Sequence, residues 1–178
     1  KLFQNQCQKM FKEIKSFYFL KHVKESKNIK HKLLKYINDS PKVSYEKVSK
    51  TDWDSCSDSD RPYVKYFIKI LKPYMYSIVK KLNTKSWAMH NMWFQQYEKS
   101  SYHTWHTHPS VQFSCVYYLE LPNINLATEF KDVENKIFKI NVKEGDLLVF
   151  PSSVLHRSPK NKSNKRKTVI SFNSSFLQ

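Results

Sequence analysis

The chain has 178 residues, of which 40% are hydrophobic and 15% aromatic, which suits one folded domain and excludes disorder along its whole length. Glycine occurs only once, at Gly145, which excludes P-loop and dinucleotide-binding proteins, because their phosphate loops need several glycines. The formal net charge is +16, with +12 in residues 1–90 (20 Lys/Arg minus 8 Asp/Glu) and +4 in residues 91–178 (11 minus 7).

The first half of the chain is predicted to be mainly helical. Apolar residues recur at spacings of three and four across residues 1–37, which predicts a helix there. They are Phe3, Cys7, Met10, Phe11, Ile14, Phe17 and Tyr18. A loop-like stretch follows from residue 37 to 60, and a second helix is predicted to begin near Pro62, with a kink at Pro73. Residues 1–86 are therefore expected to form a helical support region.

The pattern changes after about residue 87 to short segments rich in aromatic and β-branched residues. Turn signals separate these segments, as at Pro122-Asn123 and Glu144-Gly145-Asp146. Residues 87–178 are therefore predicted to contain six to eight short strands. Helices followed by strands predict an α+β protein whose N-terminal helices pack on one face of a β-barrel or sandwich.

Three histidines are the candidate metal ligands. His106 and His108 stand two apart in the segment YHTWHTHP, so in an extended chain their side chains point to the same side. His156 follows the predicted strand DLLVFP. A strand-borne pair and one distant histidine would hold a metal in the mouth of a small β-barrel. An H-x-H pair alone is a weak signal, because isolated histidines are mostly surface or core residues.

Four sequence blocks in residues 92–176 resemble the 2-oxoglutarate–Fe(II) oxygenase superfamily. The blocks read WFQQYEKSSYHTWHTHP, SCVYYLELP, EGDLLVFPSSVLH and KTVISFN, and are most similar to a group of small phage and bacterial proteins related to prolyl hydroxylases. The resemblance implies a double-stranded β-helix (a jelly-roll, cupin-like barrel) that uses Fe(II), 2-oxoglutarate and O2 and releases succinate and CO2. It assigns the metal to His106, His108 and His156, although His108 stands where the superfamily usually has aspartate. A peptidyl proline is the first substrate candidate.

The segment RKTVISFN supplies the candidate cation for the far carboxylate of 2-oxoglutarate. Alternation along a strand puts Lys167, Ser171 and Asn173 on one face, so all three are cosubstrate-pocket candidates. Arg166 is the alternative anchor, because a register slip of one residue would exchange the two faces. Lys167 is preferred, since the superfamily places its basic residue about there.

Two tyrosines complete the predicted pocket. Tyr118 lies in CVYYL, and its counterpart in hypoxia-type prolyl hydroxylases contacts the 2-oxoglutarate carboxylate. Tyr97, shortly before the H-x-H pair, resembles another pocket tyrosine of those enzymes. Trp93, Trp105 and Phe150 are expected to pack in the core.

Charge, hydropathy and cysteine content indicate the partners and the cellular compartment of the protein. A basic N-terminal half would suit nucleic acid, but lysine outnumbers arginine 28 to 3, as codon bias in an AT-rich genome would also produce. No apolar run approaches the ~20 residues of a membrane span, and no secretory signal opens the chain, so a cytoplasmic location without membrane contact is expected. The cysteines Cys7, Cys56 and Cys115 are widely spaced, which makes a disulfide scaffold improbable. The oligomeric state is not specified by the sequence.

A non-oxidative metal protein is the alternative class. Three histidines also suit zinc or nickel, as in a cupin-like isomerase or a structural viral protein that uses the same barrel. Such a protein would not need a basic residue at Lys167. A nucleic-acid adaptor without chemistry would leave the histidines unexplained.

Overall fold

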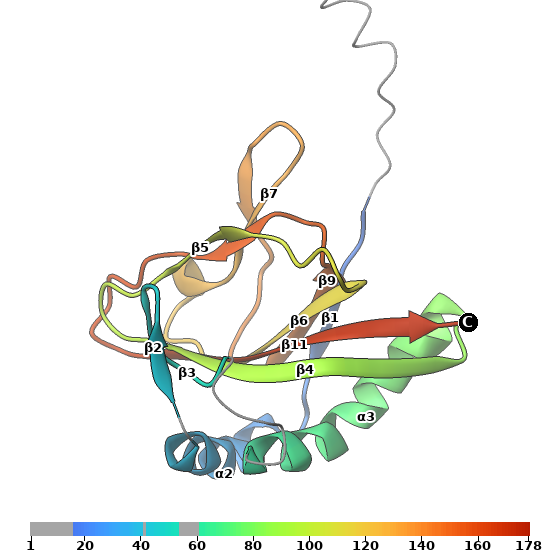
Figure 1. Ribbon diagram of the computed structural model, residues 1–178, viewed down its shortest axis with the longest axis horizontal. Helices are drawn as coiled ribbons and strands as arrows, with labels where there is room; N and C mark the ends of the chain where they lie inside the picture. Colours follow the sequence, from blue (N-terminus) through green and yellow to red (C-terminus); the bar gives the residue numbers. More distant parts are fainter. Residues whose placement is uncertain (1–15, 41, 54–60) are drawn as a thin grey trace, which may run out of the picture.

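The computed structural model describes residues 16–40, 42–53 and 61–178. Two antiparallel sheets face each other, and helices α2 and α3 cover the outer face of the larger sheet (Figure 1). The larger sheet has the order β1-β9-β6-β11-β4-β3-β2, and the smaller has the order β5-β10-β7-β8. This arrangement agrees with the predicted α+β class with helices on one face.

The elements have the following bounds. The helices are α2 (Ser26–Asp39) and α3 (Pro62–Leu82), with a short 3-10 helix at Ile124–Leu126. The larger sheet contains β1 (Phe19–His22), β2 (Val43–Tyr45), β3 (Val48–Thr51), β4 (Ser86–Tyr97), β6 (Phe113–Glu120), β9 (Asp146–Pro151) and β11 (Lys167–Leu177). The smaller sheet contains β5 (His103–His106), β7 (Glu129–Lys131), β8 (Ile137–Lys139) and β10 (His156–Ser158).

The predicted helix over residues 1–37 is wrong for part of its length. Residues 1–15 lie outside the described residues, but Phe19–His22 form strand β1, which pairs antiparallel with β9. Phe17 and Tyr18, counted on the helical apolar face, are about half exposed at 49% and 51%. The backbone hydrogen bonds offered by the edge of β9 override the helical periodicity, and the helix begins only at Ser26.

The segment predicted as a loop also contributes to the larger sheet. Strands β2 and β3 form a hairpin, and β3 pairs with β4, so this hairpin extends the edge opposite to β1. The N-terminal half therefore supplies strands to both edges of the larger sheet as well as the helical layer. Residues 41 and 54–60 of the predicted loop lie outside the described residues.

Helix α3 forms as predicted, with Pro62 at its start and Pro73 inside it. Its apolar face is buried, and Phe67 packs against Tyr117 of β6 with ring centroids 4.6 Å apart. The helix ends at Asn83, which adopts a left-handed conformation with φ 54°. Neither described helix has the length and hydropathy of a membrane span.

Strand β11 separates the two cores of the molecule. Its residues Ile170 and Phe172 face the helices and belong to the larger apolar cluster. Val169, on the opposite face, belongs to a second cluster with Phe130 of the smaller sheet. The strands after residue 86 number eight, at the upper end of the predicted range. The space between the two sheets, beside this second cluster, contains the candidate site.

Candidate metal and cosubstrate site

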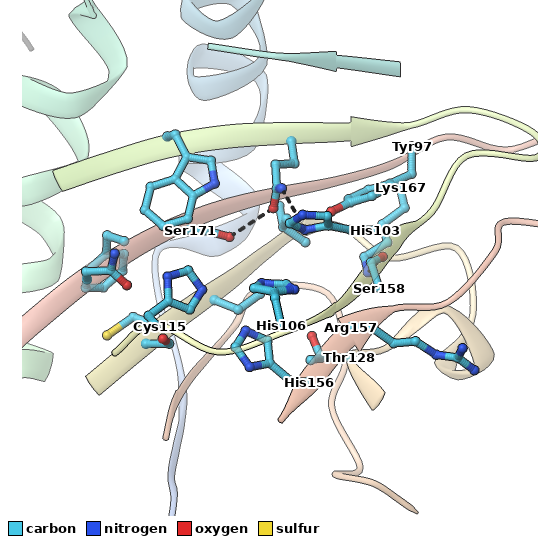
Figure 2. A pocket seen from close by; sticks show the side chains of 18 residues that line it. Tyr97, His103, His106, Cys115, Thr128, His156, Arg157, Ser158, Lys167 and Ser171 are labelled. Atoms are coloured by element: carbon cyan, nitrogen blue, oxygen red, sulfur yellow. Dashed lines mark hydrogen bonds between the residues drawn. The ribbon is translucent and has the colours of Figure 1, made fainter. Parts of the chain in front are cut away.

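The three predicted metal ligands converge between the sheets. His106 ends β5 and is the cross-strand partner of His156, which begins β10. His108 follows β5, where its backbone N–H donates to the Ser152 carbonyl oxygen at 3.0 Å. One ring nitrogen from each of the three histidines lies within 4.8 Å of those of the other two, and His106 and His156 lie side by side in Figure 2.

Backbone carbonyls select the tautomer of two of these rings. His106 Nδ1 donates to the Thr104 carbonyl oxygen at 2.8 Å, and His156 Nδ1 donates to the Val154 carbonyl oxygen at 2.8 Å. The proton on Nδ1 leaves Nε2 of each ring with a free lone pair. Each ring is therefore held in the orientation and tautomer that a metal requires.

Burial keeps the histidines neutral. It lowers the pKa of His156 to about 3 and that of His108 to about 4, and it also lowers the pKa of His106. Neutral imidazole is the form that ligates a metal, so the cluster needs little proton release when an ion binds. The donor set thus fits Fe(II), which accepts imidazole ligands.

Lys167 is a buried cation in the same pocket. Lys167 is only 2% exposed. Its Nζ donates a hydrogen bond to Ser158 Oγ at 2.8 Å and lies 5.0 Å from the centroid of the Tyr97 ring. Among the described residues no carboxylate lies within ion-pair distance of it; Glu129 is engaged with Arg157 at 2.7 Å. Burial lowers the pKa of Lys167 to about 7. An unpaired buried ammonium is costly, so this pocket suits a ligand that carries a carboxylate.

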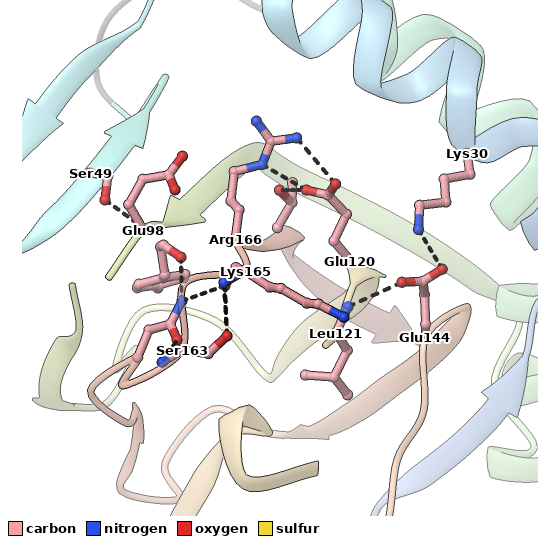
Figure 3. Close-up of polar contacts among 12 residues, drawn as sticks. Lys30, Ser49, Glu98, Glu120, Leu121, Glu144, Ser163, Lys165 and Arg166 are labelled. Carbon is pink, nitrogen blue, oxygen red and sulfur yellow. Dashed lines mark hydrogen bonds and ion pairs between the residues drawn. The ribbon is translucent and has the colours of Figure 1, made fainter. Parts of the chain in front are cut away.

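Arg166, the alternative anchor, lies on the other face of the strand. Its guanidinium donates to both carboxylate oxygens of Glu120, at 2.8 and 3.1 Å (Figure 3). Arg166 does not line the pocket, whereas Lys167 does. The structure thus places Lys167 in the lining of the pocket and pairs Arg166 with Glu120 outside it, and the role of Lys167 as cosubstrate anchor stays a prediction.

Of the remaining candidates, Tyr97, Ser171 and Asn173 line the pocket and Tyr118 does not. The Tyr118 hydroxyl donates to Thr128 Oγ1 at 2.8 Å and accepts from the Thr128 backbone N–H at 3.3 Å. In this structure the hydroxyl of Tyr118 therefore pairs with Thr128 beside the pocket, and contact of Tyr118 with the cosubstrate stays a prediction. Thr128 lines the pocket in its place.

Several pocket residues had no predicted role. His103, which the sequence places near the three ligand candidates, lies with its ring centroid 4.2 Å from that of His106, and Gln95 Nε2 lies 3.4 Å from His103 Nδ1 (Figure 2). Trp93, expected to pack in the core, both packs on Trp53 and lines the pocket. The alternation of Trp93, Gln95 and Tyr97 along β4 was the available signal, because it places them on one face.

The charge of the pocket favours an anionic ligand. Its described lining contains Lys167 and Arg157 but no aspartate or glutamate. A pocket of this kind attracts a dicarboxylate and disfavours a cation. The three-histidine cluster, a buried unpaired lysine and this charge balance are what a metal site with an acidic cosubstrate would require.

Comparison with known proteins agrees with this class. Residues 126–173, which include His156 and Lys167, match the model of a family described as putative 2OG-Fe(II) oxygenase. No curated protein matches the sequence significantly.

Solved structures show the same fold at low sequence identity. An oxidoreductase of the 2OG-Fe(II) oxygenase family from Burkholderia pseudomallei is 11% identical, with a TM-score of 0.68 over 89% of this chain and 84% of that one. A prolyl-4-hydroxylase from Pseudomonas putida is 9% identical, with a TM-score of 0.63 over 92% and 94%. A Streptomyces hygroscopicus protein solved with nickel, 2-oxoglutarate and hygromycin B is 9% identical, with a TM-score of 0.68 over 90% and 83%.

The fold is thus the double-stranded β-helix that the sequence motifs implied. The family-model match over residues 126–173 and the histidine cluster are what a 2OG-Fe(II) oxygenase of this fold would show. The cofactors of this class are Fe(II) and 2-oxoglutarate, as predicted.

Proposed function

We propose that the protein hydroxylates its substrate at an Fe(II) held by His106, His108 and His156, with the far carboxylate of 2-oxoglutarate paired to Lys167. One observation supports this proposal above all others. A lysine without a carboxylate partner and three neutral imidazoles line the same buried pocket. A purely structural metal site would need the histidines but would gain nothing from the buried cation.

The residues of the chain bind and orient, while the cofactor supplies the oxidising power. Fe(II) with 2-oxoglutarate and O2 oxidises a C–H bond and yields succinate and CO2. The carbonyls of Thr104 and Val154 hold two imidazoles in the ligating tautomer. Lys167, which lies against the ring of Tyr97, would hold the far carboxylate of the cosubstrate.

His108 makes the ligand set neutral. The common facial triad has one carboxylate, so this site carries one negative charge fewer. The pocket lining also lacks a carboxylate among the described residues. With neutral ligands, the charges of Fe(II), protonated Lys167 and a dianionic cosubstrate leave no buried excess of negative charge.

A peptidyl proline is the first substrate candidate. The likeness to the Pseudomonas putida prolyl-4-hydroxylase, which spans 92% of this chain, supports this choice. So does the related motif pattern around the histidines. Proline-containing peptides should then raise the rate of succinate formation above the rate with 2-oxoglutarate alone.

The test is turnover of 2-oxoglutarate by the purified protein with Fe(II). Succinate should form, and His156→Ala should abolish both its formation and tight Fe(II) binding measured by calorimetry. His31→Ala is the matched control, because His31 is exposed on α2, away from the pocket. Succinate formation that survives His156→Ala would exclude this cluster as the metal site. Zinc binding without any 2-oxoglutarate binding would favour the non-oxidative class.

The outer helical layer is a second, separate surface, for which we propose contact with nucleic acid. Helix α3 contains no acidic residue, and α2 and α3, which cover the outer face of the larger sheet, carry exposed lysines. They are Lys27, Lys32, Lys35, Lys65, Lys69, Lys72, Lys80 and Lys81. Such a concentration of positive charge attracts phosphate backbones without reading their sequence.

A further inference from the structure

Unsatisfied polar atoms concentrate in one row across the larger sheet. Among the described residues, four buried side-chain atoms lack a hydrogen-bond partner: Asn91 Oδ1, Gln96 Nε2, Ser114 Oγ and Asn173 Oδ1. Asn173 on β11 is the cross-strand partner of Asn91 on β4 and of Ser114 on β6. Three of the four atoms therefore belong to one continuous set of neighbours, named here the Asn91–Asn173–Ser114 row.

This row lies at the end of the pocket that the cosubstrate does not reach. Asn173 and Ser114 line the pocket, and they are 5% and 4% exposed. Asn173 stands six residues after Lys167 on the same strand, a separation of about 20 Å. A five-carbon diacid that pairs with Lys167 and chelates the metal is too short to span this distance.

The close-up view agrees with this placement. Cys115, the sequence neighbour of Ser114, lies at one end of the group of side chains, and Lys167 lies at the other (Figure 2). His106 and His156 lie between them (Figure 2). The metal site thus separates a cationic end, suited to the cosubstrate, from a second end with different chemistry.

The chemistry of the second end is polar and uncharged. Of the residues that line the pocket, Trp93, His108, Ser114 and Asn173 lie on its inner face near this row. Amide oxygens of asparagine accept hydrogen bonds, and a serine hydroxyl both donates and accepts. Buried groups of this kind are nearly always paired in folded proteins, so their grouping beside a reaction site points to a ligand that pairs with them. A charged ligand group would meet no counter-charge there.

We propose that the Asn91–Asn173–Ser114 row binds the substrate through an uncharged group with at least two hydrogen-bond donors. A carboxamide and a pair of neighbouring hydroxyls both have this chemistry, and the ring of Trp93 forms an aromatic wall beside it. The inference rests on the proposed function in taking the bound molecule to be the substrate. The binding itself requires no turnover.

The first test measures binding to protein that cannot react. The protein is loaded with Zn(II) and N-oxalylglycine, an inert analogue of 2-oxoglutarate, and probes are followed by saturation-transfer NMR. Two matched pairs serve as probes: N-acetylglutamine methylamide with N-acetylglutamate methylamide, and methyl glucoside with methyl glucuronide. At least one neutral probe should bind, and its charged counterpart should not. The pair that responds distinguishes an amide from a polyol.

Substitution in the row should remove this binding. Asn173→Leu keeps the side-chain size but removes the acceptor, and it should weaken the neutral probe about tenfold or more. Ser114→Ala should weaken it less, because the hydroxyl is the smaller contribution. Binding of neither neutral probe, or binding that survives both substitutions, would overturn the proposal.

The second test separates a binding role from a structural one. If the row is unsatisfied without ligand, Asn173→Leu and Ser114→Ala should leave Tm unchanged or raise it by about 2–4 °C. Ser174→Ala is the matched control, since Ser174 faces the other way and accepts from Trp87 Nε1 at 2.9 Å. This control should lower Tm and leave probe binding intact. An equal fall in Tm for Asn173→Leu would show a structural asparagine and overturn the inference.

These outcomes are distinct from failure of the proposed function. Turnover of 2-oxoglutarate without binding of either neutral probe would remove the substrate subsite and leave the oxygenase. Probe binding that depends on Asn173, in a protein that never forms succinate, would keep the subsite and remove the proposed reaction.

Discussion

The two faces of strand β11 differ in how completely their residues are satisfied. On the helix side, Ile170 and Phe172 are enclosed by apolar side chains of α3 and β6, and one of the four unpartnered polar atoms, Gln96 Nε2, lies on that face. The other three lie on the pocket side, where Lys167 and Asn173 are both buried but lack a carboxylate and a hydrogen-bond donor, respectively. Packing on the helix side stabilises the fold, whereas the buried unpaired groups on the pocket side lower the free energy of unfolding until a ligand pairs with them.

The cosubstrate anchor should give the largest effect. Lys167→Ala should weaken 2-oxoglutarate binding on the order of a hundred- to a thousandfold, because breaking a buried charge pair costs about 3–5 kcal/mol. Fe(II) affinity should change little, because the histidines lie away from Lys167. Isothermal titration of the Fe(II) protein under anaerobic conditions measures both quantities.

Arg166→Ala is the matched control for this prediction. Arg166 pairs with Glu120 at the partly exposed outer face, so cosubstrate affinity should stay near that of the wild type. A severe loss with Arg166→Ala and a mild one with Lys167→Ala would show that the pocket-side assignment of β11 is off by one residue. If neither substitution changes the affinity for 2-oxoglutarate, the result would favour the non-oxidative metal protein.

Substitutions on the helix side should lower the free energy of unfolding and leave 2-oxoglutarate binding unchanged. Phe67→Ala removes a fully buried ring that packs on Tyr117, and it should lower the free energy of unfolding by about 3–5 kcal/mol. Ser171→Ala on the pocket side should cost about 1 kcal/mol or less, because its bond to Gln95 is long at 3.5 Å. Urea denaturation of both variants gives the comparison. Equal losses would contradict the division of roles between the faces.

The pH dependence of stability and of 2-oxoglutarate binding tests the pocket side at Lys167 alone. Burial lowers the pKa of Lys167 from 10.5 to about 7 in the protein without ligand. Between these values the unfolded chain binds the proton that the folded chain has lost, so stability should rise with pH across that window. A carboxylate partner restores the charged form, so 2-oxoglutarate should bind with proton uptake and more weakly as pH rises above 7.

Two measurements check this behaviour. Calorimetry in buffers of different ionisation enthalpy counts the protons taken up on binding. Lys167→Met should remove both the uptake and the slope of stability with pH. A dissociation constant for 2-oxoglutarate that does not change above pH 7 in the wild type would refute a depressed lysine pKa.

The smallest effect concerns the outer helical layer. Binding of a DNA or RNA oligonucleotide should fall steeply from low to physiological salt, because released counterions drive such binding. Replacing Lys65, Lys69 and Lys72 by glutamine should reduce the affinity at low salt without altering succinate formation. Absence of binding at low salt would leave codon bias as the explanation of the lysine content.

The errors of the sequence-based prediction share one cause, which is pairing between distant segments. Residues 19–22 carried a helical pattern but form β1, because the edge of β9 supplies their hydrogen bonds. Pairing of the same kind engages the Tyr118 hydroxyl with Thr128 of another segment, while contact of Tyr118 with the cosubstrate stays a prediction. The Asn91–Asn173–Ser114 row exists only across three strands, so no local spacing predicts it.

The sequence by itself determined the elements whose signals are local. The spacing of His106 and His108, the alternation from Lys167 to Asn173 and the apolar face of α3 all followed from the geometry of one strand or one helix. Only the tertiary structure decided that His156 meets His106, that Lys167 and not Arg166 enters the pocket, and that Asn173 lacks a partner. Register between strands far apart in the chain sets these contacts, and register depends on the packing of both faces at once.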